Sequence, residues 1–290
     1  MTGGIINVLK PPGMTSHDVV AFVRRVYGLK KVGHAGTLDP AAAGILPVFL
    51  GPATRLIEYT ADRDKAYRVE LTFGYATDTG DDTGAVIRRA STDGLPAAGE
   101  LFAVLQDFVG TIDQIPPMHS AIKIAGKKLY ELAREGIEIE RQPRKVVIKA
   151  IRPIKLDPPV LLFDVACSKG TYIRSLCLDI GERLGCPATM SFLVRTRVGD
   201  FDLDHAFSLE EIAAEPKAAV LPAEHAVRHL PGIILPSAAS RAFGNGQVVA
   251  CEAGGRTALY AVFDERGVLV GIGESTSGQS GLKPLKVMPH

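Results

Sequence analysis

The chain has 290 residues, a formal net charge of +1 and 46% hydrophobic residues, enough for one large domain with a sizeable core and a second, smaller one. It has no run of 18 apolar residues and no basic segment followed by an apolar core at its start. We therefore expect neither a membrane-spanning helix nor a secretory signal. Four cysteines without C-x-x-C spacing argue against a zinc site and favour a reduced, cytoplasmic protein.

The first part of the chain predicts two helices and a strand. Segment 15–28 opens with a capping-box pattern, continues with apolar residues at helical spacing and ends at a glycine, which predicts a helix. Apolar and polar residues alternate over 67–73, which predicts a strand with one buried face. Residues 74–85, rich in Gly, Asp and Thr, predict a loop, and one apolar face predicts a helix over about 97–108.

The middle of the chain predicts a mixed architecture. Proline pairs and basic residues over 113–155 interrupt the pattern, as an insertion would. Strands are predicted at 145–155, 160–167 and 191–198, and an amphipathic helix at about 171–184. Short strands between helices predict an α+β fold with a mixed, largely antiparallel central sheet flanked by helices.

Proline and glycine mark a boundary near residue 232, so we divide the chain into 1–231 and 232–290. Two apolar runs, 258–263 and 268–273, flank a polar turn and predict a β-hairpin. The second part is therefore expected to be a small β-rich module.

Positive charge is unevenly distributed. Residues 121–155 contain ten basic and four acidic residues, and the rest of the chain balances them. Such a local excess is typical of a surface that contacts phosphates. A solvated, charged hairpin is the alternative explanation.

Segment 33–48 places a single acidic residue, Asp39, among small, apolar and turn-forming residues. Its glycines permit unusual backbone angles, and Pro40 biases Asp39 towards an extended conformation. This pattern indicates a shaped loop that holds one carboxylate in an apolar wall, where it could act as a catalyst. The alternative is an ordinary helix start, with Asp39 as N-cap and Pro40 in the first turn.

Five blocks of sequence, in chain order, share a pattern with one enzyme family. They are residues 7–16 (NVLKPPGMTS), 33–48 (GHAGTLDPAAAGILPV), 65–68 with 77–81 (KAYR and TDTGD), 114–123 (QIPPMHSAIK) and 168–176 (SKGTYIRSL). From about residue 4 to about residue 210 the chain resembles the TruB family of tRNA pseudouridine-55 synthases. Ala35 and Thr37 depart from the family's pattern, but they only flank Asp39.

The resemblance implies the pseudouridine synthase fold, with 113–155 as an RNA-gripping thumb and 232–290 as a PUA-type RNA-binding domain. A β-rich module that only packs on the catalytic domain is the alternative for the second part. The implied reaction converts the uridine at position 55, in the T-arm loop of tRNA, to pseudouridine. It requires no net redox change or group transfer, so no cofactor or metal is expected.

The resemblance also assigns three catalytic residues. Asp39 is the catalytic carboxylate, although its step (attack on C1′, attack on the base or removal of a ribose proton) is left open. Tyr67 stacks on the flipped uracil and serves in proton transfer at C5; its strand position by itself predicts only a core aromatic. Arg174 pairs with Asp39, which orients the carboxylate; the alternative is a solvated arginine that contacts phosphate.

Several further residues are expected to bind the substrate. By resemblance, His34 stacks within the RNA loop and helps to expel the uridine; a buried structural histidine is the alternative. Leu193 aligns with an apolar residue that shapes the pocket. Lys10 lies at the site wall or contacts phosphate, unless it is merely a strand-end lysine. The predicted substrate-binding set is completed by Gly36, Lys123 and Tyr172.

Three functions compete: a stand-alone tRNA enzyme, a guide-dependent pseudouridylase subunit and a tRNA-folding chaperone that uses the same surface. The segment 113–155 resembles the thumb of the stand-alone bacterial type and favours the first function. The presence of Asp39, Tyr67 and Arg174 argues against a chaperone alone. We therefore expect tRNA as the partner, no obligatory protein partner and a monomer.

Overall fold

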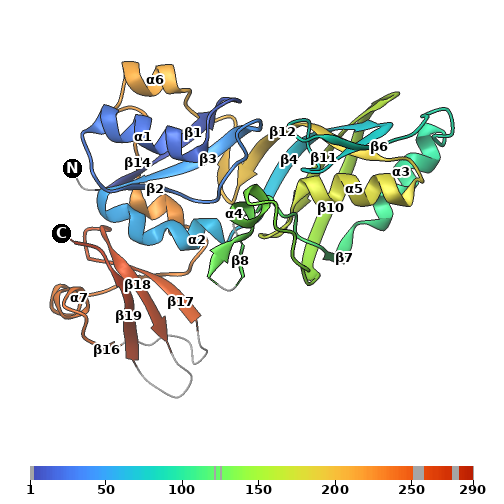
Figure 1. Cartoon of the computed structure of the whole chain (residues 1–290). Helices are drawn as coiled ribbons and strands as arrows, with labels where there is room; N and C mark the ends of the chain where they lie inside the picture. The colour runs from blue at the N-terminus through green and yellow to red at the C-terminus, as the bar shows by residue number, and fades with distance from the viewer. Residues whose placement is uncertain (1–2, 121, 125, 251–257, 276–280, 290) are drawn as a thin grey trace.

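The computed structural model describes residues 3–120, 122–124, 126–250, 258–275 and 281–289. A long sheet runs through the larger part of the molecule, and a second, smaller sheet lies beside one end of it (Figure 1). The described helices are α1 (Ser16–Tyr27), α2 (Ile57–Ala61), α3 (Ala98–Asp107), α4 (Leu129–Arg134), α5 (Ile173–Arg183), α6 (Leu209–Ala214) and α7 (Ser237–Gly244), with 3-10 turns η1 (Gly51–Leu56) and η2 (Ala223–Val227).

The long sheet is mixed and largely antiparallel, which confirms the predicted fold class. Its strands follow one another in space as β14 (Leu221–Pro222), β1 (Gly4–Lys10), β3 (Ala43–Leu50), β12 (Ala188–Val198), β4 (Lys65–Phe73), β11 (Val160–Cys167), β10 (Arg144–Asp157) and β7 (Gly110–Gln114). Two short strands join it at the side: β2 (Val32–His34) pairs with β3, and β13 (Phe201–Asp202) pairs with β12.

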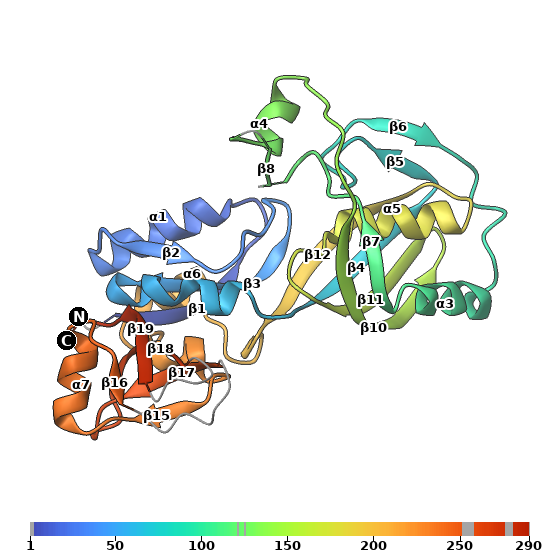
Figure 2. The ribbon, with the colours of Figure 1, turned by 90° about the horizontal axis from the view of Figure 1, so that it is seen from below.

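The two halves of this sheet meet at one short parallel pairing. Strands β3 and β12 are joined only where Val194 lies opposite Ala43 and Arg195 opposite Gly44. Helices α3 and α5 cover the half that contains β4 and β10, whereas α1 lies over β2 and β3 in the other half (Figure 2). The junction between β3 and β12 is therefore where residues from both halves come together.

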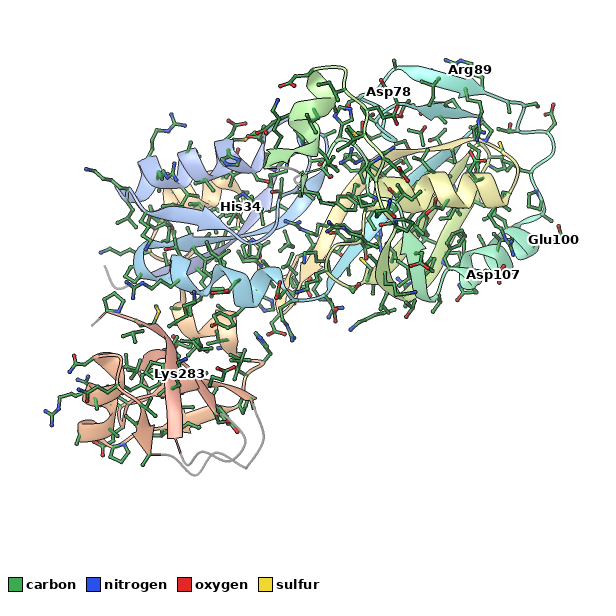
Figure 3. The ribbon with its side chains drawn as sticks, turned by 60° about the horizontal axis from the view of Figure 1, so that its bottom comes forward. His34, Asp78, Arg89, Glu100, Asp107 and Lys283 are labelled. Carbon is green, nitrogen blue, oxygen red and sulfur yellow. The ribbon has the colours of Figure 1, made fainter. Side chains whose placement is uncertain are left out.

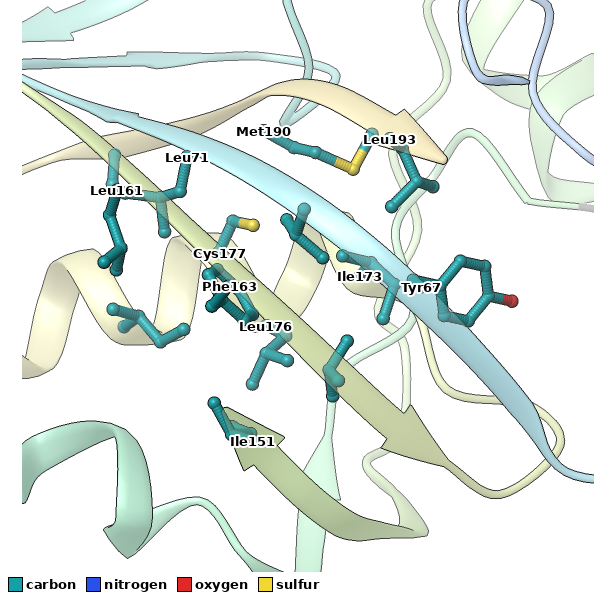
Figure 4. Close-up of a cluster of buried hydrophobic side chains, with 14 of the residues drawn as sticks. Tyr67, Leu71, Ile151, Leu161, Phe163, Ile173, Leu176, Cys177, Met190 and Leu193 are labelled. Carbon is teal, nitrogen blue, oxygen red and sulfur yellow. The ribbon is translucent and has the colours of Figure 1, made fainter. Parts of the chain in front are cut away.

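Local sequence explains the predicted elements. Thr15 Oγ1 accepts a hydrogen bond from the Asp18 backbone N–H (3.0 Å), and the Asp18 carboxylate accepts one from Thr15 N–H (2.8 Å), which makes the predicted capping box. Helix α1 ends at Gly28, whose φ of 63° is left-handed. Strand β4 buries alternate side chains against α5, and this cluster forms the core of its half of the sheet (Figure 4).

Two sequence-based boundaries need correction. Residues 144–157 are not part of an excursion, because β10 pairs with both β7 and β11 in the long sheet. Of the predicted insertion 113–155, only residues 115–143 lie outside the long sheet. The described part of this segment contains α4 and a small hairpin of β8 (Lys123–Ile124) and β9 (Lys127–Lys128). The predicted loop 74–85 contains β5 (Tyr75–Thr77), which pairs with β6 (Val86–Arg89). The bond pattern of the strands, with β7 and β11 on the two sides of β10 and with β6 beside β5, decides both cases.

The second sheet has the order β15 (Gly232–Ile234), β17 (Ala258–Phe263), β18 (Leu269–Ser275), β19 (Gly281–Val287) and β16 (Val249–Ala250). Strands β17 and β18 make the predicted hairpin. The module packs on the larger part, because Ile272 and Met288 share an apolar cluster with Ile5. Its separate sheet is compatible with the predicted division at 232, and a role in RNA binding stays a prediction.

Three cysteines, Cys167, Cys177 and Cys186, are buried free thiols, and Cys251 lies outside the described residues. Within the described ranges, no helix is both long and apolar enough to cross a membrane. The same part of the chain holds no group of three or more His, Cys, Asp or Glu side chains arranged to bind a metal ion.

Candidate active site

Asp39 lies in the loop between β2 and β3, at the junction of the two sheet halves. The alternative of a helix start is wrong: the chain makes one turn, closed by the Ala42 N–H to the Asp39 carbonyl (3.1 Å), and enters β3 at Ala43. Strand pairing of β3 with β1 and β12 takes the residues that a helix would have needed.

Side chains from neighbouring elements hold this loop. Ser16 Oγ, at the start of α1, accepts from the Leu38 N–H (2.9 Å) and donates to the Leu38 carbonyl (3.1 Å). Lys10 Nζ donates to the Pro40 carbonyl (3.2 Å). The Asp39 side chain, by contrast, keeps 37% of its surface exposed. Buried side chains thus hold the backbone on both sides of Asp39, while its carboxylate is partly exposed to solvent.

Arg174 makes the predicted ion pair with Asp39. Its Nε lies 3.2 Å from Asp39 Oδ2, and its side chain is only 7% exposed. The remaining nitrogens donate to the carbonyls of Thr79 (3.2 Å) and His119 (2.8 Å). A solvated arginine that contacts phosphate is therefore wrong for this structure, because protein groups occupy the guanidinium.

A second carboxylate, Asp81, completes this arrangement, and the sequence analysis did not single it out. Its Oδ2 lies 3.7 Å from Arg174 Nε, and its Oδ1 accepts from Thr79 Oγ1 (2.8 Å) and the Thr83 N–H (3.0 Å). The Met190 N–H donates to the Gly80 carbonyl (3.1 Å), which ties the turn to β12. Its presence in the TDTGD block was the available signal.

Tyr67 is a core aromatic, as its strand position predicts, and its role in stacking on uracil and in proton transfer stays a prediction. It is 7% exposed and belongs to the core cluster, but its ring lies at the edge of that cluster with the hydroxyl directed away from it (Figure 4). Burial raises the pKa of Tyr67 to about 12, and the nearby positive charge of Arg195 offsets part of that rise. The phenol therefore stays protonated at neutral pH.

A small pocket opens beside the two carboxylates. Its wall includes Asp39, Asp81 and Leu193, and the role of Leu193 in shaping a substrate pocket stays a prediction. The cavity volume is about 20 Å³, room for about one water molecule. A nucleobase would need the pocket to open.

His34 is the last residue of β2 (Figure 3), five positions before Asp39 in the sequence. Its ring meets that of His17 edge-on, with centroids 5.8 Å apart, and its Nδ1 is buried without a hydrogen-bond partner. Burial lowers the pKa of His34 to about 4, so the ring is neutral at pH 7. Its role in displacing a base stays a prediction.

Lys10 is fully buried, and its ammonium donates to the carbonyls of Pro11 (2.8 Å), Met14 (2.7 Å) and Pro40. Burial lowers its pKa to about 8. The expectation of a phosphate contact is wrong in this conformation, because all three donors are taken. The site-wall reading fits the bond to Pro40.

The remaining predicted binding residues are placed as follows. Tyr172 caps α5, and its backbone N–H (2.8 Å) and carbonyl (3.0 Å) both bond to the buried Gln114 amide. Gly36 has a φ of 86° within the Asp39 loop. Lys123 starts β8, but its side chain lies outside the described part of the structure.

The basic segment 121–155 is partly neutralised by local ion pairs. Examples are Lys127 with Glu135 (3.4 Å), Arg141 with Glu138 (3.2 Å) and Lys155 with Asp157 (2.8 Å). Exposed pairs of this kind contribute little to stability and can exchange for phosphate contacts. The two explanations of the segment, a charged hairpin and a phosphate surface, are thus compatible.

An aspartate on a glycine-rich loop lies at the junction of the two halves of a mixed sheet, is paired with a buried arginine and helps to raise the pKa of a buried tyrosine. This fold and site define a pseudouridine synthase. The TruB family pseudouridylate synthase N-terminal domain matches residues 24–173, and the tRNA pseudouridylate synthase B C-terminal domain matches residues 174–237. The chain therefore belongs to the TruB family of pseudouridylate synthases.

Curated relatives are similar to this chain in sequence over most of its length. A tRNA pseudouridine synthase B of Caldanaerobacter subterraneus subsp. tengcongensis is 49% identical over 93% of this chain and 94% of its own. One of Symbiobacterium thermophilum is 53% identical over 82% of this chain and 80% of its own. Among solved structures, a chain of a Cbf5-Nop10-Gar1 complex superposes with a TM-score of 0.77 at 29% identity, covering 99% of this chain and 85% of that one.

Proposed function

We propose that this enzyme converts the uridine at position 55, in the T-arm loop of tRNA, to pseudouridine. The observation that carries the proposal is the partly exposed Asp39 carboxylate, which is paired with the buried Arg174 and whose charge helps to raise the pKa of the buried Tyr67. The names of its relatives, tRNA pseudouridine synthase B, support tRNA as the substrate.

The reaction breaks the bond between N1 and C1′ of the uridine, rotates the uracil and joins C5 to C1′. The proton at C5 is lost and N1 gains one, so atoms and electrons balance without a cofactor. Asp39 is the group that acts on the sugar or the base, and Arg174 fixes the direction of its carboxylate. Tyr67, protonated at neutral pH, supplies a ring surface and a hydrogen-bond donor rather than a base.

The uridine must leave its stack to reach Asp39, at a cost of a few kcal/mol. The cavity beside Asp39 is too small for a base, so we propose that the wall that includes Leu193 and Phe192 moves when the uridine enters. Phe192 is 41% exposed at the rim, where it could contact an incoming base. His34 is proposed to fill the space that the uridine leaves.

We propose that segment 115–143 and the C-terminal module grip the RNA, and that the enzyme acts as a cytoplasmic monomer without a guide RNA. The excursion of 115–143 beside α5 and the Asp39 loop supports the first part (Figure 2). The bond from Arg174 to the His119 carbonyl links this segment directly to the site.

The test uses the full chain and an unmodified tRNA transcript without other components, with pseudouridine mapped to the nucleotide. Conversion of one T-arm uridine is expected. Conversion elsewhere in the tRNA would overturn the site assignment, and conversion only of RNA outside tRNA would overturn the substrate.

Guide dependence is the second candidate, since the chain is similar to the Cbf5-Nop10-Gar1 structure. It predicts no conversion by the protein alone and conversion after a guide RNA and partner proteins are added. A chaperone without catalysis predicts faster tRNA folding and no pseudouridine under either condition.

A further inference from the structure

Arg195 is a buried cation that neither the sequence analysis nor the proposed reaction uses. It lies in β12 and is 1% exposed, which makes it one of the largest fully buried side chains in the described structure. A charge in such a place is costly unless every donor has a partner. The identity of those partners therefore indicates what the residue does.

Two of the three guanidinium nitrogens donate to backbone carbonyls of the loop that carries Asp39, and the third donates to a carbonyl of β3, the strand that follows this loop. Nε donates to Ile45 (2.7 Å), Nη1 to Thr37 (3.1 Å) and Nη2 to Gly36 (3.0 Å). These carbonyls lie on both sides of Asp39 in the sequence. The planar, fork-shaped guanidinium thus fixes the two ends of the loop relative to each other.

The same residue also contacts the Tyr67 strand. In β12, Arg195 is paired in register with Gly44 of β3 and with Tyr67 of β4. Gly44 permits the close approach, because a Cβ there would lie 2.2 Å from the Arg195 carbonyl oxygen. Arg195 is therefore joined to the carriers of two catalytic residues from opposite halves of the sheet.

We propose that Arg195 is a positioning residue of the isomerisation, which holds the Asp39 loop in register with Tyr67. The expected effect on the reaction rate rests on the proposed function. The clamp, by which we mean the three hydrogen bonds from Arg195 to the carbonyls around Asp39, does not depend on it. A lysine cannot replace Arg195, since one ammonium cannot reproduce three donors in a plane. Loss of the clamp leaves the tRNA-binding surface intact and misplaces Asp39.

The kinetic test compares Arg195→Lys with Arg197→Lys, the same change at an exposed position two residues further along β12. For Arg195→Lys we expect the single-turnover rate constant to fall at least about tenfold, equivalent to about 1.4 kcal/mol, with a tRNA Kd within about twofold of wild type. Arg197→Lys should keep both values. A folded Arg195→Lys variant with a wild-type rate, or one that loses tRNA affinity and rate together, overturns the proposal.

Hydrogen exchange gives a readout that needs no activity. The amides of Ala35, Leu38 and Ala42 donate hydrogen bonds within or next to the loop. In Arg195→Lys we expect them to exchange at least about tenfold faster while the amides of α1 keep wild-type rates. Equal acceleration throughout the chain would indicate simple destabilisation and overturn the proposal.

If Arg195→Lys does not fold at the assay temperature, Arg195→Gln, which is uncharged and less costly to bury, takes its place under the same criteria. Hydrogen exchange of the wild-type protein tests the clamp even without a variant. If the loop amides exchange within seconds while the amides of α1 stay protected, the clamp is contradicted. A wild type that forms no pseudouridine but shows the protected loop contradicts the proposed function and not the clamp.

Discussion

At the scale of single residues, Arg174 carries much of the site's geometry. Its Nε is shared by Asp39 and Asp81, and its other nitrogens hold two carbonyls, so the guanidinium has little freedom to rotate. Asp81 in turn is fixed by Thr79 and Thr83. The direction of the Asp39 carboxylate thus depends on Asp81 as well, through their shared partner Arg174.

Asp81→Asn tests this dependence. The amide keeps the shape but not the charge, so Arg174 loses one of its two anionic partners and holds Asp39 less rigidly. We expect the single-turnover rate to fall by about tenfold or more, with unchanged tRNA affinity. Asp204→Asn, the same change at an exposed position outside the pocket beside Asp39, is the control; equal rates for the two variants would contradict the account.

His34 gives a prediction for stability against pH. Its folded pKa of about 4 is below the ordinary 6.5, so between these values the unfolded chain binds more protons. The contribution of His34 to stability is therefore lost as the pH falls from about 6.5 towards about 4. We expect the Tm of wild type to fall more between pH 7 and pH 5 than that of His34→Phe.

His205 supplies a control of opposite sign. It pairs with Asp202 at 2.8 Å, and this hydrogen bond raises its pKa. Protonation therefore favours the folded state, and His205→Gln should make the loss on acidification slightly larger. Parallel Tm curves for wild type and His34→Phe would show that His34 is not buried as a neutral ring.

At the scale of elements, the contact between β3 and β12 is the narrowest part of the long sheet. It depends on Gly44, whose φ is 113° and whose Cβ position is occupied by the Arg195 backbone. A side chain here would meet backbone atoms, which have no rotamer to adopt. The sheet halves, and with them Asp39 and Tyr67, come together only because this residue is glycine.

Gly44→Ala is accordingly expected to lower the free energy of unfolding by more than about 3 kcal/mol, through a clash and a strained φ. Gly99→Ala in α3 is the matched control, since nothing lies within 4 Å of its Cβ position; alanine there should be neutral or stabilise by up to about 1 kcal/mol. Urea unfolding of both variants measures the difference. Similar midpoints would contradict the described junction.

The elements also show what the sequence could predict. The α1 capping box, the β4 alternation and the β17–β18 hairpin depend on residues that are close together in the sequence. Local sequence patterns therefore predict them. The true extent of β10 and the turn at Asp39 depend on strands far away in the sequence. The role of Arg195 was missed for a different reason, because a charged residue in a strand is ordinarily assigned to the surface.

At the scale of the whole molecule, the site lies where the two sheet halves, the excursion 115–143 and the turn at 78–85 converge. The resemblance in sequence identified Asp39, Tyr67 and Arg174, and the structure shows the contacts that bring them together. A net charge of +1 means that attraction to RNA must come from local surfaces and not from the total.

This arrangement predicts that tRNA binding weakens with salt. Phosphate contacts release counterions, so we expect affinity to fall at least about tenfold between about 50 and about 200 mM salt. Filter binding or fluorescence anisotropy at several salt concentrations measures the slope. An affinity independent of salt would contradict an RNA-binding surface.

The most direct test of the account is single-turnover pseudouridine formation by wild type and Asp39→Asn on the same tRNA transcript. Asparagine is nearly isosteric but cannot act as a carboxylate. We predict that both proteins bind tRNA with similar Kd, that wild type converts one T-arm uridine, and that the variant is slower by at least about a thousandfold, or about 4 kcal/mol. Equal conversion by the two proteins would contradict the assignment of Asp39 as the catalyst.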